Sequence, residues 1–312
     1  MSYRSPLLDS AGAVESEGVD AGVPAHYGQP VPEQRRLEAG DGWVDLSHRD
    51  VLSIGGPDRL TYLHAMTTQA FEGLPSGSPT EALVLSPHGH IEHAFDGSDD
   101  GEVFVASTEP GQGAALAAFL DRMRFMLRVE VTLLTDVLAV VHQPDTGHRI
   151  IERHTLGEYA VEHGPPSGTW AYDALRIASG RPRIGLDSDH RTIPNELGLL
   201  GRAVELDKGC YRGQETVARV HTLGRPPRRL VLLHLDGSAD RLPGHLAQIH
   251  ADGRVVGFIG SSARHHELGP IALALVKRNV PVDSVLLADG VAASQEAIVD
   301  PEVGLHVRPV VR

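Results

Sequence analysis

The sequence predicts an α+β body followed by a small domain made of β-strands. Up to about residue 225, segments with the alternating pattern of strands are interspersed with segments whose apolar residues have helical spacing. The stretch "GRPPRR" at 224–229 then forms a stiff, basic connector, and beyond it short apolar strands are separated by turn residues at barrel-like intervals. A chain of 312 residues also exceeds what one hydrophobic core usually serves, so we expect more than one domain.

The elements of the body follow from local patterns of apolar, turn-forming and capping residues. Pro57 suits the first position of a helix, and Leu60 and Leu63 share one face of that helix. Pro87 and Gly89 form a turn between two strands. Together these patterns predict two short strands in 42–56, a helix in 56–68, strand–turn–strand in 81–97, a strand in 101–107, a helix in 113–127, β-structure in 129–141 and a short helix in 172–179.

Three regions are expected along the chain. Residues 1–35 mix small, polar and acidic residues without apolar periodicity, which predicts a flexible N-terminal tail. Residues 36–224 form the α+β body, in two lobes. Residues 225–312 form a β-barrel domain, with strands expected in 230–236, 254–262 and 271–278.

The composition excludes several classes of function. A net charge of −13 argues against broad nucleic-acid binding. No apolar run reaches the length of a membrane span, and the N-terminus lacks the basic and apolar parts of a secretory signal. The single cysteine excludes an intramolecular disulfide and cannot supply the several thiolates of a typical zinc or iron–sulfur site. We therefore expect a cytoplasmic protein that binds neither a membrane nor nucleic acid directly.

The single cysteine, Cys210, lies in the stretch "KGCYRGQE" at 208–215. An isolated cysteine is often a small buried hydrophobic residue. Here, however, a neighbouring lysine can activate a thiol, a flanking glycine lets a ligand approach the backbone, and a ring, an amide and a carboxylate follow at once. Polar groups of such different kinds are costly to bury unless they contact something, which favours a binding or reactive site. The residues concerned are Lys208, Gly209, Cys210, Tyr211, Gly213, Gln214 and Glu215.

Arginines gather around this stretch in an otherwise acidic chain. Such a cluster suits an anion, either a carboxylate or a phosphate, but it also suits a solvated basic linker, and composition alone leaves both readings open. The residues are Arg212, Arg219, Arg225, Arg228 and Arg229.

A carboxylate upstream, Glu196 in "TIPNELGLL" (192–200), also has two interpretations. It could accept paired N–H donors from a heterocycle, or it could begin a helix after a turn at Pro194, and the pattern alone favours the helix start.

Histidines cluster in "PHGHIEHAF" (87–95), which raises the question of a metal site. On a strand, His90 and Glu92 share one face while His93 points to the other, and His88 lies in the turn. Because these side chains do not converge, we expect no metal site.

The motif "KGCYRGQETVAR" (208–219) closely resembles the signature of the YgfZ family, whose members are folate-binding proteins related to the T-protein (aminomethyltransferase) of the glycine cleavage system. Further stretches support the resemblance in the same order, and together they cover roughly residues 42–312: "DLSHRDVLSIGGPDRLTYLHAMTT", "ALVLSPHGHIEHAF", "LRIASGRPRIGLDSDHRTIPNELGLL" and "VVGFIGSSARHHELGPIALALVKR".

The resemblance implies a three-lobed body around a central hole that binds tetrahydrofolate, followed by the small β-barrel. It implies that Glu196 holds the folate pteridine and that the 208–215 motif lines the same region. Arg228 and the other arginines would then suit the glutamate carboxylates of the folate.

One departure from the related aminomethyltransferases concerns the strand after the turn, where those enzymes carry an acidic residue that serves methylene transfer. Here that position is Ala94, whose side chain can neither orient nor deprotonate a substrate. The resemblance therefore implies a tetrahydrofolate-binding accessory factor for assembly or maintenance of iron–sulfur proteins, with Cys210 as the functional thiol and client or assembly proteins as partners. The alternative is a folate-dependent aminomethyltransferase or demethylase, and a true aminomethyltransferase is not expected.

Overall fold

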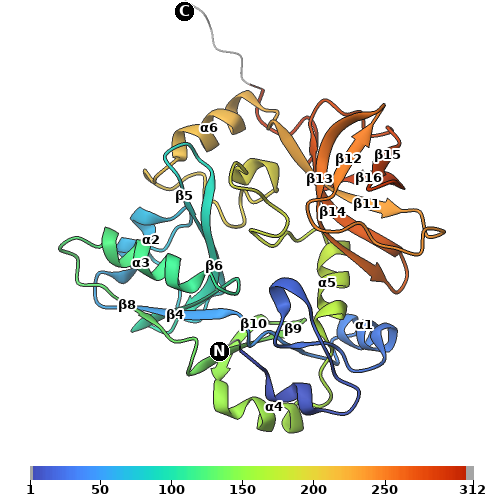
Figure 1. Cartoon of the computed structure of the whole chain (residues 1–312). Helices are drawn as coiled ribbons and strands as arrows, with labels where there is room; N and C mark the ends of the chain where they lie inside the picture. Colours follow the sequence, from blue (N-terminus) through green and yellow to red (C-terminus); the bar gives the residue numbers. More distant parts are fainter. Residues whose placement is uncertain (1–2, 307–312) are drawn as a thin grey trace, which may run out of the picture. The chain divides into compact units, whose positions relative to one another are not determined.

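A computed structural model describes residues 3–306 of the chain (Figure 1). The chain divides into two compact units. The first comprises residues 1–65, 70–82 and 93–175, and the second comprises residues 66–69, 83–92 and 176–312. The predicted boundary near residue 225 lies inside the second unit, just before the first strand of the barrel at Arg228. Residues 1–2 of the predicted tail and 307–312 of the predicted barrel domain lie outside the described residues.

The first unit contains most of a five-stranded sheet with the strand order β5-β6-β7-β4-β8. Strand β4 pairs antiparallel with both β7 and β8, and β7 pairs antiparallel with β6. Helix α3 buries Leu116, Phe119 and Leu120, as its predicted apolar face requires. The elements are β4 (Asp50–Gly55), α2 (Arg59–Met66), β5 (Thr80–Leu85), β6 (Ile91–Asp99), β7 (Val103–Thr108), α3 (Gly113–Met123) and β8 (Glu130–Leu133).

A smaller sheet with the order β10-β9-β3 completes the first unit, together with α1, α4 and most of α5. Trp43 and Tyr159 meet edge to face with ring centroids 4.9 Å apart in its core. The elements are α1 (Pro30–Glu38), β3 (Val44–Asp45), β9 (Leu138–Gln143), β10 (Gly147–Glu152), α4 (Leu156–Glu162) and α5 (Thr169–Ala178).

The prediction of a flexible tail is wrong for residues 3–35, which form short ordered elements. Leu7, Val23 and Ala25 are buried and contribute to the core, whereas Val14, Val19 and Val31 are exposed. Polar contacts fix it further, because Ser5 donates a hydrogen bond to Asp45 at 2.5 Å and Asp20 pairs with His48 at 2.8 Å. Isolated anchors of this kind leave no periodic pattern in a sequence. The elements are η1 (Pro6–Asp9), β1 (Val14–Glu15), η2 (Gly18–Asp20), β2 (Pro24–His26) and the start of α1.

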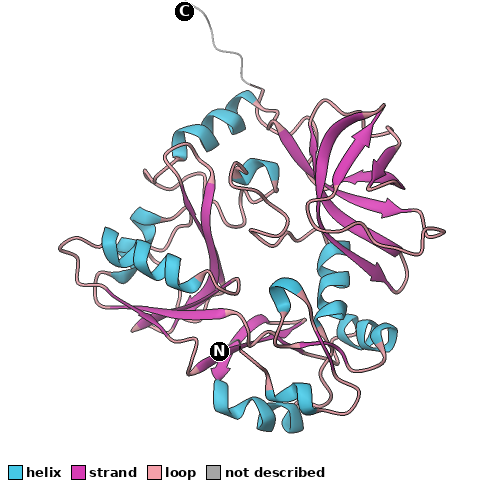
Figure 2. Ribbon diagram, viewed as in Figure 1, coloured by secondary structure: helices cyan, strands magenta, loops and turns pink. Residues whose placement is uncertain are grey.

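The second unit ends in a closed barrel with the strand order β11-β14-β13-β12-β15-β16 (Figure 2). Alternate residues of its strands face the barrel core, among them Val231 and Leu233 of β11 and Ala272 and Ala274 of β14. The α+β fold class with a small C-terminal β-barrel is therefore confirmed. The strands are β11 (Arg228–Leu235), β12 (Gln248–Ala251), β13 (Arg254–His265), β14 (Gly269–Lys277), β15 (Leu286–Ala288) and β16 (Val291–Ala297).

Two more elements of the second unit matter for the site, the 3₁₀-helix η4 (Pro194–Glu196) and the helix α6 (Gln214–Leu223). The sequence pattern favoured a helix start at Glu196, but the chain makes only this single turn and Glu196 ends it. Helix α6 was not expected. No helix within residues 3–306 is long and apolar enough to cross a membrane.

Candidate functional site

The "KGCYRGQE" motif forms the approach to helix α6. Gly213 caps the helix with φ of +82°, a conformation that residues with a side chain rarely adopt. A Cβ atom at this position would lie 2.5 Å from the carbonyl oxygen of Ser86, in the turn between β5 and β6. Glycine is thus required here because the motif packs directly against that turn.

Lys208 is an internal anchor of the motif. Its ammonium group donates hydrogen bonds to the backbone carbonyls of Thr67 at 2.6 Å and Gln69 at 3.0 Å, and it lies 5.2 Å from the centre of the Tyr211 ring. Burial raises the pKa of Tyr211 to about 12, so this side chain remains a neutral phenol at physiological pH. This role of Lys208 leaves no local pattern in the sequence, because Thr67 and Gln69 are far away along the chain.

Cys210 and Gly209 are exposed between this anchor and helix α6. Arg212, two residues further on, pairs with Glu92 at 2.6 Å, which ties the motif to the beginning of β6. Glu215 is exposed in the first turn of α6, where a carboxylate is favourable near the positive end of the helix. The surrounding residues therefore hold an accessible thiol on a well-anchored bend.

Glu196 is buried, with 1% of its side chain exposed, and both carboxylate oxygens are already engaged. Arg228 donates from Nε to Oε1 at 2.8 Å and from Nη2 to Oε2 at 2.9 Å. The backbone N–H of Ile193 donates to Oε2 at 3.1 Å. A carboxylate offers about four lone-pair positions, and these three hydrogen bonds leave capacity for about one further N–H donor.

Arg228 also binds a second carboxylate, that of Asp189. Its Nη1 donates to Oδ2 at 2.7 Å and its Nη2 to Oδ1 at 3.1 Å. Burial acts to raise the pKa of the Asp189 carboxyl, but hydrogen bonds from Arg228 and Thr192 outweigh it and hold this pKa well below its ordinary value. With its guanidinium group shared between two acids, Arg228 is not placed to receive the carboxylates of a ligand.

The other arginines of the cluster divide between surface pairs and internal contacts. Arg225 pairs with exposed Glu302 at 2.9 Å. Arg229 is fully buried in the barrel and donates to the carbonyl of Val280 at 2.8 Å and to Gln295 at 2.8 Å. Arg219 is exposed on α6. These contacts favour the interpretation of the cluster as structural over the anion site that its composition also allowed.

Asn195 connects η4 with α6 and was not singled out from the sequence. Its Nδ2 donates to the carbonyl of Val217 at 3.3 Å. Its Oδ1 is buried and has no hydrogen-bond partner among the described residues. Since an unpaired buried acceptor is unfavourable, a ligand N–H donor would be favourable at this point, beside Glu196.

The predicted histidine cluster is split by the fold. Ser86 Oγ accepts the backbone N–H groups of His88 at 3.2 Å and His90 at 3.1 Å, which shapes the turn, and the two rings lie 6.3 Å apart. His93 belongs to the first unit, where its ring lies 5.8 Å from that of Phe119.

Comparisons with known proteins show similarity to aminomethyltransferases, both in sequence and in fold. The chain is 36% identical to an aminomethyltransferase of Streptomyces coelicolor over 334 residues, covering 88% of this chain and 89% of that protein. A protein of Arabidopsis thaliana named as a putative chloroplastic transferase is 26% identical over 271 residues; the match covers 70% of this chain and 61% of the length of that protein. The crystal structure of the glycine cleavage system aminomethyltransferase T of Bartonella henselae has the same fold, with a TM-score of 0.79, 18% identity, and coverage of 96% of this chain and 97% of that one.

The fold is therefore that of an aminomethyltransferase. The chain belongs to the aminomethyltransferase family, on the strength of the Streptomyces coelicolor relative. No protein-family model matches the chain.

Proposed function

We propose that the protein is a tetrahydrofolate-binding accessory factor for the assembly or maintenance of iron–sulfur proteins, as in the YgfZ family that it resembles. The observation that carries the proposal is the "KGCYRGQE" motif, with the single cysteine of the chain exposed on a bend that Lys208 and Gly213 fix in place. Membership of the aminomethyltransferase family supports the folate part.

The residues of the second unit fit a pteridine ligand in part. Asn195 Oδ1 lacks a donor and Glu196 retains some acceptor capacity, so we propose that these adjacent residues receive the N–H groups of the pteridine. The sequence predicted that Lys208 and Arg228 would contact the folate directly. Both side chains are engaged within the protein, so we assign them supporting roles instead. In this proposal, Lys208 supports the motif and Arg228 orients the Glu196 carboxylate, while Gly209, Tyr211, Gly213, Gln214 and Glu215 border the ligand.

The strand after the turn argues against the parent aminomethyl transfer. Ala94 has only a methyl side chain, and its backbone carbonyl accepts a hydrogen bond from Thr108 at 2.7 Å. No group at this position can therefore take up or deliver a proton. Family membership keeps a one-carbon enzyme as the second candidate, and formation of methylene-tetrahydrofolate from an added methylamine by the purified protein would favour it.

The proposal predicts that Cys210→Ala abolishes function without affecting folding. The thiol is exposed, so its loss removes no buried contact, and only its chemistry is lost. In a strain lacking the gene, the activities of iron–sulfur enzymes should be restored by the wild-type protein and should stay at the empty-vector level with Cys210→Ala.

Asp207→Asn provides a matched control, because Asp207 is an exposed neighbour in the same segment, and this variant should restore the activities fully. Full restoration by Cys210→Ala would refute the thiol's role, and unchanged activities in the deletion strain would refute the iron–sulfur function itself.

A further inference from the structure

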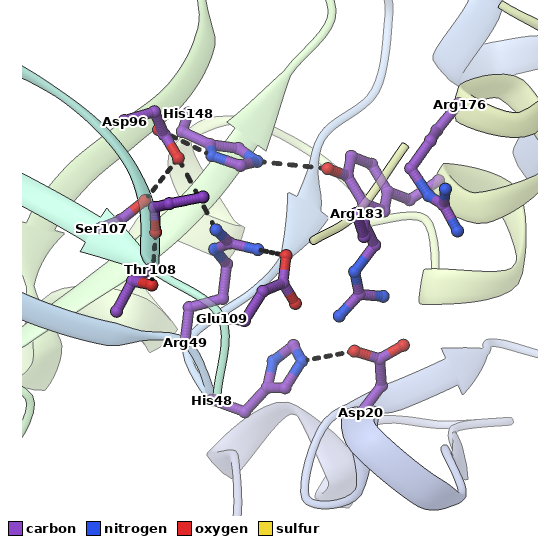
Figure 3. A network of polar contacts seen from close by, with 12 residues as sticks. Asp20, His48, Arg49, Asp96, Ser107, Thr108, Glu109, His148, Arg176 and Arg183 are labelled. Atoms are coloured by element: carbon purple, nitrogen blue, oxygen red, sulfur yellow. Dashed lines mark hydrogen bonds and ion pairs between the residues drawn. The ribbon is translucent and has the colours of Figure 1, made fainter. Parts of the chain in front are cut away.

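The five-stranded sheet of the first unit has an unpaired edge. Its interior strands are tied by polar contacts, since Asp96 of β6 pairs with His148 of β10 at 2.9 Å and accepts a hydrogen bond from Ser107 of β7 at 3.1 Å (Figure 3). Strand β8, by contrast, is the last in the order β5-β6-β7-β4-β8, and its outer edge pairs with no strand among residues 3–306 (Figure 1). Such an edge is a template for pairing with a further strand.

The backbone groups at this edge follow from the pairing of β8 with β4. The N–H of Leu134 donates to the carbonyl of Val51 at 2.7 Å, so these opposite residues form a hydrogen-bonded pair. Bonded and non-bonded pairs alternate along an antiparallel ladder, so Thr132 is the next residue of β8 that bonds to β4. Val131 and Leu133 therefore direct their N–H and C=O groups away from β4, toward the open edge.

Exposed apolar side chains gather around the same edge, within residues 125–137. Met126, in the loop between α3 and β8, is 98% exposed. Burying apolar surface is favourable by about 25 cal/mol per Å², so a group as dense as this one is typical of an interaction surface. The exposed large hydrophobic residues of this stretch are Phe125, Met126, Leu127, Leu133 and Val137.

We propose that β8 pairs antiparallel with β8 of a second copy of this chain, about a two-fold axis at Thr132. In this register Val131 of each copy lies opposite Leu133 of the other, and the outward N–H and C=O groups of these residues bond to each other. Thr132 meets its own counterpart in a non-bonded pair. The two five-stranded sheets thereby become one continuous sheet.

The residues that flank β8 favour a second copy over an unrelated segment. In the same register Leu127 of one copy comes level with Val137 of the other, and these side chains are 40% and 57% exposed. Arg128 comes level with exposed Asp136, which brings opposite charges together. Asp58 accepts from Nε and Nη2 of Arg128, so Nη1 is left to face the second carboxylate. This surface contains none of the residues proposed to bind folate, so the inference does not depend on the proposed function.

Disulfide trapping in the full chain tests the register. Thr132→Cys, combined with Cys210→Ser so that no other thiol is present, should form an intermolecular disulfide in oxidised glutathione, because non-bonded partners have Cα atoms about 4.5 Å apart. Glu130→Cys in the same background is the matched control. It lies two residues away on the same strand, its counterpart would be about 14 Å distant, and it should stay unlinked. No disulfide with Thr132→Cys, or equal cross-linking of the two variants, would overturn the proposed pairing.

Sedimentation velocity of the wild-type chain measures the dimer itself. The strands that pair are short and the interface is small, so we expect a dissociation constant of about 100 µM. Leu133→Lys places a charge at the edge and should raise this constant at least about tenfold. Leu268→Lys is the matched control and should dimerise as the wild type does, because Leu268 is 45% exposed against 46% for Leu133 and lies in the turn between β13 and β14. A wild type that is monomeric at about 500 µM, or equal dimerisation of Leu133→Lys, would overturn the proposal.

Discussion

Replacing Arg228 by Met should destabilise the second unit by about 3 kcal/mol, because it leaves two carboxylates without their shared cation. Glu196 is 1% exposed and Asp189 27% exposed, so the loss falls mainly on Glu196. Urea unfolding followed by far-UV circular dichroism measures the change, and hydrogen exchange of the backbone amides in 189–196 should locate it.

The sign of the pH dependence follows from Asp189. The pKa of Asp189 is lowered in the folded protein, so its pairing stabilises the fold above its unfolded pKa of about 3.9 and is lost as pH falls toward the lowered value. The stability difference between the wild type and Arg228→Met should therefore shrink below about pH 4. Arg225→Met is the control, since its pair with Glu302 is exposed and contributes only about 0–1 kcal/mol. Equal effects of the two substitutions would contradict the structural role assigned to Arg228.

Asp187→Ala should have a comparable or larger effect, about 3–5 kcal/mol, because it removes the buried carboxylate that neutralises the guanidinium of Arg176. The Asp187 side chain is fully buried and accepts from Arg176 Nη1 at 2.8 Å, from the backbone N–H of Arg183 at 2.8 Å and from Ser261 Oγ at 2.6 Å. The contact with Ser261 joins the segment that leads to Glu196 with strand β13 of the barrel. Losing this hydrogen bond should weaken the attachment of that segment to the barrel.

The same urea experiment measures this effect, with Asp283→Ala as the control. Asp283 is exposed in the loop between β14 and β15, and its replacement should change the free energy of unfolding by less than about 0.5 kcal/mol. A loss below 1 kcal/mol in Asp187→Ala, roughly what a surface pair contributes, would show that the buried network is not a major source of stability.

The sequence was sufficient for features that local pattern encodes. The alternation in 81–97 and the turn at Pro87 and Gly89 correspond to β5 and β6, and the apolar face of 113–127 corresponds to α3. The basic connector at 224–229 ends where β11 begins, and the short strands after it close into the barrel. Each of these signals lies within a few neighbouring residues, where spacing alone determines the structure.

The candidate site could be located by its motif but not described, because its contacts are distant in sequence. Lys208 reaches the carbonyls of Thr67 and Gln69, and Arg228 reaches Glu196, and neither pairing leaves a local pattern. The same reason accounts for residues 3–35, where single anchors such as Ser5 hold an aperiodic segment. It also accounts for Asp96 and His148, which are far apart along the chain but lie 2.9 Å apart in the fold.

Titration of tetrahydrofolate into the purified protein by calorimetry tests the central claim most directly. The wild type should bind it at a single site, and Glu196→Gln, which removes the charge beside Asn195 Oδ1, should bind it at least about tenfold more weakly. Glu267→Gln, an exposed carboxylate in the turn between β13 and β14, should bind as tightly as the wild type. Absence of binding by the wild type, or equal affinity of Glu196→Gln and the wild type in folded protein, would contradict the account.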